Sequence, residues 1–147
     1  MLYGEINRGY VKSTKNQIKK HYTQMSEREL DYLKYKLNHI DTIEISEHLY
    51  DKITVNFNEE NILSILKTET YNIIEFNQVD NYSDERVLVR STRPFLVDIK
   101  KKKKLCDMCF VVSIKTNRVI TLYYNERKDG HDTINFNRYN ADLKIIH

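Results

Sequence analysis

The sequence is poor in residues that interrupt regular structure. It has no tryptophan, one proline and three glycines in 147 residues, which argues against a loop-rich or many-turned domain. No apolar run approaches the roughly 20 residues that a membrane-spanning helix needs. The N-terminus, Met-Leu-Tyr-Gly-Glu, has no apolar region of the signal-peptide type. We therefore expect a cytoplasmic protein without a membrane partner.

Cysteine is also scarce, and other metal or cofactor motifs are missing. Cys106 and Cys109 have the C-x-x-C spacing of zinc and redox motifs, but no second pair completes a metal site. The favoured interpretation is two small buried hydrophobic side chains in a reducing compartment. The sequence has no phosphate-binding glycine loop, no H-E-x-x-H and no nucleophile elbow. It therefore indicates no metal and no cofactor.

The longest apolar pattern lies in residues 109–124. Two runs rich in β-branched and aromatic residues flank a short polar link, which predicts a β-hairpin. Cys109, Val111 and Ser113 should face one side of the sheet, and the residues between them the other. Asn117 in the link tolerates the left-handed backbone that a tight turn needs. This hairpin is the predicted core.

Four helices are predicted before residue 70. A short basic helix is expected from residue 13 or 14 to about 24, and a clearer one at 26–40, where Ser26 and Glu29 form a capping box. A third is expected at 46–53 and a fourth from Asn58 to about 66. The pattern leaves open whether the third and fourth are separate helices or one bent unit.

From Tyr71 the apolar period changes to two, and strands are predicted at 71–79 and 86–91. A short strand at 95–99 is an open alternative within the connection 92–105. The expected fold is a single α+β domain over 1–147, with N-terminal helices packed on a four-stranded antiparallel β-meander. Its parts are a basic arm and helix (1–25), helices (26–70), the antiparallel sheet (71–125) and a C-terminal tail (126–147).

Positive charge and tyrosine are concentrated in a few places, although the net charge is only +3. Such surfaces suit phosphate backbones, acidic protein surfaces and stacking on bases. A solvated arm and loop is the simpler alternative. The candidate binding residues lie in the N-terminal arm and in one unbroken lysine run: Tyr3, Tyr10, Lys15, Lys19, Lys20, Lys100, Lys101, Lys102, Lys103 and Lys104.

Four other residues are candidates for catalysis. His48 lies in a predicted helix, Arg90 in a predicted strand, and His131 and Thr133 in the loop after the last strand. Two imidazoles can act as general base and acid on an RNA 2′-hydroxyl and its leaving oxygen, while a guanidinium stabilises the phosphorane. The favoured interpretation is that these residues are ordinary surface histidines and a strand arginine paired with a carboxylate such as Glu75.

The segment from His48 to Tyr139 resembles small phage and mobile-element proteins of the barnase/EndoU/colicin/RelE-type ribonuclease fold. The matching pattern is a helical His48, the strand 86–90, and Val-Ile-Thr-Leu-Tyr-Tyr-Asn-x₅-His-x-Thr-x₅-Tyr ending at Tyr139. The resemblance covers about two-thirds of the chain and is one of pattern. It implies catalytic roles for His48, Arg90, His131 and Thr133. The residue usage also resembles that of low-GC bacteria and their phages, where small inhibitors of host defence occur.

Two hypotheses follow. The first is a non-catalytic binding protein, similar to anti-CRISPR proteins, that inhibits a host nucleic-acid enzyme such as a CRISPR effector nuclease with bound RNA. The second is a metal-independent ribonuclease or toxin. We rank binding first because the basic and tyrosine-rich surface lies outside the catalytic candidates, and because local spacing does not bring those candidates together.

Overall fold

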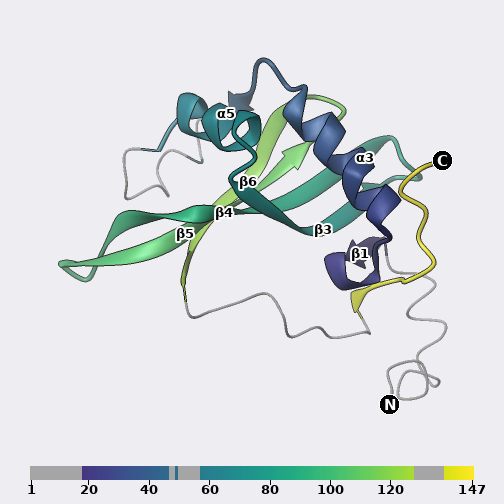
Figure 1. The fold of residues 1–147 in the computed structure, drawn as a ribbon. Helices are drawn as coiled ribbons and strands as arrows, with labels where there is room; N and C mark the ends of the chain where they lie inside the picture. Colours follow the sequence, from purple (N-terminus) through teal and green to yellow (C-terminus); the bar gives the residue numbers. More distant parts are fainter. Residues whose placement is uncertain (1–17, 47–48, 50–56, 128–137) are drawn as a thin grey trace, which may run out of the picture.

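The computed structural model describes residues 18–46, 49, 57–127 and 138–147. Within them, six strands form one mixed sheet in the order β1-β3-β4-β5-β6-β2, and two α-helices lie on one face of it (Figure 1). A single 3₁₀ turn, η2 (Tyr22–Gln24), follows the first strand. The strands are β1 (Lys19–His21), β2 (Glu44–Ile45), β3 (Tyr71–Val79), β4 (Asp84–Ile99), β5 (Lys102–Ser113) and β6 (Arg118–Glu126); the helices are α3 (Glu27–Asn38) and α5 (Glu59–Lys67).

The predicted fold of helices on a four-stranded antiparallel meander is therefore wrong. Where the basic helix was expected to run to about residue 24, residues 19–21 form β1 and residues 22–24 form η2. β1 pairs antiparallel with β3. β2 pairs with β6 in parallel. Both added strands are two or three residues long and hold their place through backbone pairing, which an apolar side-chain pattern does not reveal.

Helix α3 is confirmed close to its predicted position. The Ser26 side chain accepts a hydrogen bond from the Glu29 amide, and the Glu29 carboxylate accepts one from the Ser26 amide. These bonds satisfy two of the amides that a helix start leaves without partners. Leu33 and Leu37, four residues apart on one side of the helix, are fully buried. The helix therefore packs with a narrow apolar stripe against the sheet.

Helix α5 begins after Asn58, as predicted. The Asn58 side chain accepts a hydrogen bond from the Asn61 amide, and Glu59 and Glu60 occupy the favourable first turn. Ile62, Ile65 and Leu66 are buried in the same core as α3. Of the helix predicted at 46–53, all positions except 46 and 49 lie outside the described residues.

The predicted hairpin forms β5 and β6 and supplies the centre of the core. Phe110 and Val112 are fully buried beneath the helices, while Cys109 packs on the other face with Ile74 and Leu88. Asn117 takes the expected positive φ of 56°. A β-bulge between Val111 and Val112 shifts the register with β6, so strict alternation along the second strand fails. No helix in the described part of the chain is long and apolar enough to cross a membrane.

Candidate nucleic-acid interface

The connection expected at 92–105 is a two-stranded ribbon formed by the far ends of β4 and β5. β3 pairs with β4 only as far as Ser91, and β6 pairs with β5 only from Cys106 onward. Beyond these points the two strands continue as partners from Leu96–Leu105 to Ile99–Lys102. Figure 1 shows the ribbon extending past the rest of the sheet. We call residues 96–105 the basic ribbon.

The ribbon closes in a two-residue turn made by lysines. Lys100 and Lys101 have positive φ values of 50° and 66°, and Ile99 pairs with Lys102 on either side of them. Positive φ at both central residues is the requirement of a type I′ turn, which favours Asn-Gly. A side chain with a Cβ adopts this backbone at a cost of about 1–2 kcal/mol per residue. The turn therefore places charge where other residues would fold more easily.

All five lysines of the run are exposed and stand on both faces of the ribbon. In an antiparallel pair, directly opposite residues share a face. Lys102 and Lys104 therefore lie on the face of Ile99 and Val97, and Lys103 lies with Asp98 on the other. The Lys104 ammonium is 3.0 Å from the Glu126 carboxylate, an exposed ion pair of small energetic value. The ribbon thus carries positive charge around its end.

An apolar pair marks the base of the ribbon. Leu96 and Leu105 are directly opposite each other and are 58% and 55% exposed. On the other face, Val97 is fully buried and Phe95 meets Phe57 edge-to-face at 5.0 Å between ring centroids. That face is anchored to the main core, whereas the leucines lie uncovered next to the lysines. A lone exposed leucine is ordinary, and the opposed pair adds a small exposed apolar surface beside the charged tip.

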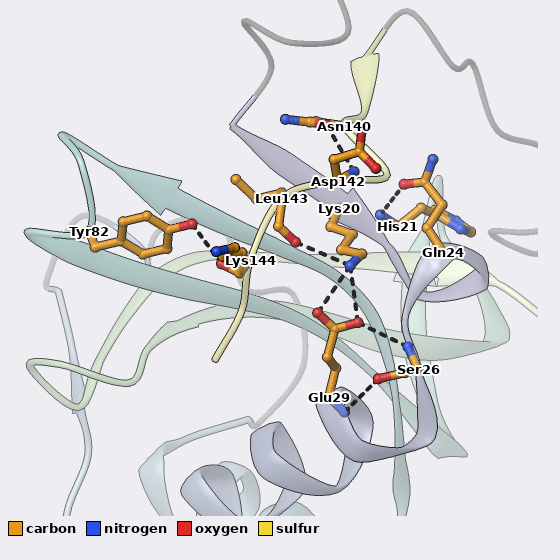
Figure 2. Close-up of polar contacts among 10 residues, drawn as sticks. All are labelled: Lys20, His21, Gln24, Ser26, Glu29, Tyr82, Asn140, Asp142, Leu143 and Lys144. Atoms are coloured by element: carbon orange, nitrogen blue, oxygen red, sulfur yellow. Dashed lines mark hydrogen bonds and ion pairs between the residues drawn. The ribbon is translucent and has the colours of Figure 1, made fainter. Parts of the chain in front are cut away.

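Lys20 and Lys19, the described candidates of the N-terminal segment, are engaged within the protein. Lys20 is 6% exposed, and its ammonium donates to both Glu29 carboxylate oxygens at 3.0 Å and to the Leu143 carbonyl at 3.1 Å (Figure 2). Burial alone would raise the pKa of Glu29, but hydrogen bonds from Ser26 and Lys20 lower it overall. Lys19 lies 3.4 Å from the Glu75 carboxylate. Lys20 therefore ties β1, α3 and the tail together and presents no exposed charge.

The described part of the C-terminal tail, residues 138–147, is held by further hydrogen bonds. The Tyr82 hydroxyl donates to the Lys144 carbonyl at 2.6 Å, and the Asn140 amide donates to the Lys19 carbonyl at 2.8 Å (Figure 2 shows the first of these). Ile145 is fully buried in the core. These contacts attach the end of the chain to β1 and to the turn between β3 and β4.

Among the four catalytic candidates, Arg90 alone lies within the described residues. Arg90 is 7% exposed; its Nε donates to Asp107 at 3.0 Å and its guanidinium also donates to the Glu126 carbonyl at 3.1 Å. Arg127 reaches the same Asp107 carboxylate at 3.2 Å. The guanidinium is thus enclosed in a buried charge network and does not lie open to a phosphate. His48, His131 and Thr133 lie outside the described residues, as do Tyr3, Tyr10 and Lys15.

A shallow hollow of about 170 Å³ lies on the sheet face away from the helices. Lys19, Glu75, Asn77 and Arg86 are among its lining residues. Its charges are paired locally: Glu75 accepts from the Tyr139 hydroxyl at 2.7 Å, and Arg86 contacts Asp84 at 2.8 Å. The charged side chains of the hollow are therefore engaged by partners within the protein.

The two cysteines are buried structural side chains. Both are free and fully buried, and burial raises the pKa of Cys109 to about 12 and also that of Cys106. Thiols are the unreactive form. In the part of the chain that the structure describes, no group of three or more His, Cys, Asp or Glu side chains could hold a metal ion.

Sequence reasoning found the lysines of the ribbon but missed its geometry and its leucine pair. The alternation of Leu96, Asp98 and their neighbours was a strand signal, but the lysine run concealed the second strand. Comparisons of the chain with protein-family models, curated proteins and solved structures found no match.

Proposed function

We propose that this chain is a non-catalytic binding protein that inhibits a host nucleic-acid enzyme through the basic ribbon. The proposed target is an enzyme such as a CRISPR effector nuclease. The chain would then act as anti-CRISPR proteins from phages and mobile elements do. The observation that carries the proposal is the ribbon end, where exposed lysines occupy even the two positive-φ positions of the turn. Local rules of folding are commonly broken at functional sites.

The ribbon supports binding because it combines charge with reach. Lys100–Lys104 gives five positive charges against Asp98 within residues 96–105, and the strands hold them away from the body of the sheet. An enzyme acting on nucleic acid must bring a polyanion to its active site. A cationic protein can block that step in two ways. It can bind the nucleic acid itself, or it can bind an acidic surface of the enzyme beside the nucleic acid.

The ribonuclease alternative gains no support from Arg90. A catalytic arginine must approach the phosphorane oxygens, but the Arg90 guanidinium is bonded to Asp107 and the Glu126 carbonyl. Its release would leave the Asp107 carboxylate buried with less compensation, which is costly. RNA cleavage is therefore the competing hypothesis, and the experiment below includes an assay for it.

The test uses three forms of the full chain. The ribbon variant replaces Lys101, Lys102 and Lys103 by glutamine, and the matched control replaces Lys34, Lys36 and Lys144, which are also exposed. Both variants remove three charges. Each protein is titrated into a plasmid-cleavage reaction containing a purified RNA-guided nuclease.

We expect the wild type and the control to slow cleavage in proportion to their concentration, and the ribbon variant to have lost most of this effect. In a parallel incubation with bulk RNA in EDTA, the RNA should stay intact. Fragmentation that follows the purified wild-type protein, and disappears in His48→Ala/His131→Ala, would overturn the proposal in favour of the ribonuclease.

A further inference from the structure

We propose that the ligand of the basic ribbon is duplex DNA in the B form, with the end of the ribbon inserted in the major groove. This inference names the partner class for the function proposed above, and its role in inhibition rests on that function. The binding itself does not, and it is tested separately. Four features of the ribbon point to this ligand: its charge distribution, its size, its turn and its leucine pair.

The distribution of lysines fits a ligand that surrounds the ribbon. Lys102 and Lys104 lie on one face, Lys103 on the other, and Lys100 and Lys101 at the end. A flat acidic surface would meet only one of these sets. At the end of the ribbon, beyond the buried Val97, Lys102 and Lys103 lie on opposite faces. A groove of duplex DNA has phosphates along both walls, so both of these lysines find anions at once. Enzyme channels for nucleic acid are commonly basic, so the ribbon complements the DNA and not the channel.

The size of the ribbon fits the B-DNA major groove. The two-stranded part runs over four register pairs from Leu96–Leu105 to Ile99–Lys102, which are three steps, or roughly 10 Å at about 3.3 Å per residue. The major groove is about 12 Å wide and about 8.5 Å deep and admits a two-stranded β-ribbon. The major groove of A-form RNA is too narrow for side chains to read. The geometry therefore favours DNA over duplex RNA.

The turn indicates that charge at the end of the ribbon serves a purpose other than folding. Lys100 and Lys101 hold positive φ values where Asn and Gly would be favoured. Other turns of the described residues also have side chains with a Cβ at positive φ, such as Glu69 and Tyr82, but this turn places two cationic side chains there. Backbone strain of this kind is concentrated at binding and active sites.

The leucine pair lies where the ribbon leaves the sheet, next to Lys104 and three register pairs behind Ile99–Lys102 at the turn. With the end of the ribbon in the groove, Leu96 and Leu105 would meet the sugar edges at its mouth. Their exposure of 58% and 55% supplies apolar surface that is buried on contact. Asp98 lies on the same face as the two leucines, directly opposite Lys103. The positive charge of Lys103 offsets the repulsion between the Asp98 carboxylate and a phosphate.

The experiment measures the affinity of the full chain for a fluorescent 20-base-pair DNA duplex, by anisotropy, at salt concentrations from 50 to 200 mM. The probes for comparison are the RNA duplex of the same sequence and a poly-glutamate chain as acidic protein surface. The variants are the ribbon variant, its matched control, Leu96→Ser/Leu105→Ser and Lys100→Asn/Lys101→Gly.

Five phosphate contacts predict that the DNA affinity of the wild type falls roughly 500-fold across this salt range, and two contacts predict roughly tenfold for the ribbon variant. The control should behave like the wild type. The leucine variant should bind more weakly with an unchanged salt slope, because no charge is removed. Lys100→Asn/Lys101→Gly should bind DNA more weakly while unfolding at a higher temperature, which excludes misfolding as the cause.

Tighter binding to duplex RNA or to poly-glutamate than to DNA would overturn the inference, as would equal salt slopes for the ribbon variant and its control. If nuclease inhibition persists under either result, the proposed function stands and only the DNA assignment fails. RNA fragmentation in EDTA would sink the proposed function while leaving the DNA measurements to decide this inference.

Discussion

Lys20 shows how one residue of a basic segment can serve folding and not binding. Its sequence neighbours are Lys19 and His21, and the charge pattern alone groups it with a cationic arm. In the structure its ammonium has three oxygen partners at 3.0–3.1 Å, two on Glu29 and one on Leu143. A buried charge needs such compensation, because a lysine without it would destabilise the fold.

We expect Lys20→Met to lower the free energy of unfolding by roughly 1.5–3 kcal/mol, the usual range for losing hydrogen bonds to a charged group. The half-buried Glu29 carboxylate and the Leu143 carbonyl would lose their shared donor. Urea unfolding followed by circular dichroism gives the value. Lys34→Met on the exposed side of α3 is the control and should change stability by less than about 0.5 kcal/mol. Equal effects in the two variants would contradict the role of Lys20.

Glu29 should make stability depend on pH in the acid range. Its burial alone would raise the pKa, but the bonds from Ser26 and Lys20 lower it below its ordinary value of 4.5. A lowered pKa in the folded state gives stability that is complete above the unfolded value and is lost as pH falls through the folded one.

We therefore expect Glu29→Gln to be clearly less stable than the wild type at pH 7, with the gap closing below about pH 4.5. Comparing the two proteins at each pH removes the contribution of other carboxylates such as Asp84. Urea titrations at pH 7, 5, 4 and 3 measure the gap. A gap that is constant over this range would mean that the carboxylate charge does not contribute.

At the scale of single elements, the turn of the ribbon separates stability from function. Replacing Lys100 by Asn and Lys101 by Gly should raise the free energy of unfolding by about 1–2 kcal/mol, because these residues adopt positive φ with less strain. For a chain of this size that is a rise of roughly 2–8 °C in Tm. Differential scanning fluorimetry is sufficient to detect it.

The same substitution moved two residues along, Lys102→Asn/Lys103→Gly, is the control for the turn. These positions lie in β5, where Gly and Asn are disfavoured, so this variant should melt below the wild type. If both double variants shifted Tm in the same direction, the positive φ of the turn would not be the cause of the change in Tm.

Elements with an apolar stripe or alternation could be predicted from the sequence, and those without one could not. The Ser26–Glu29 capping box and the leucine spacing of α3 located that helix, and the Asn58 cap located the start of α5. β1 and β2 have no such pattern, since they are short edge strands held by backbone bonds. The first four residues of β5 are Lys-Lys-Lys-Leu, and lysine is depleted in strands.

At the scale of the whole molecule, the missed strands change the architecture. The pattern from Tyr71 onward predicts antiparallel neighbours, but a strand supplied by residues 19–21 and a parallel one by 44–45 widen the sheet to six. Pairings across such distances in sequence depend on tertiary contacts, which local periodicity does not encode.

The candidate site was predictable in composition but not in placement. Charge alone marked Lys20 and Lys100–Lys104 alike, yet the fold buries the first and extends the second away from the core. Arg90 likewise looked available in its strand but is enclosed with Asp107. Whether a charged side chain is exposed depends on which segment packs over it, and that is a property of the assembled chain.

The central claim is that the ribbon, and not the helices or the sheet faces, carries the contact with DNA. The most direct measurement is a titration of the ¹⁵N-labelled full chain with a 20-base-pair DNA duplex, followed by amide chemical shifts. We expect shifts and broadening in residues 96–105, with the amides of α3 and α5 unchanged. Shifts concentrated on a helix or on the hollow near Lys19 and Arg86, with an unperturbed ribbon, would contradict the account.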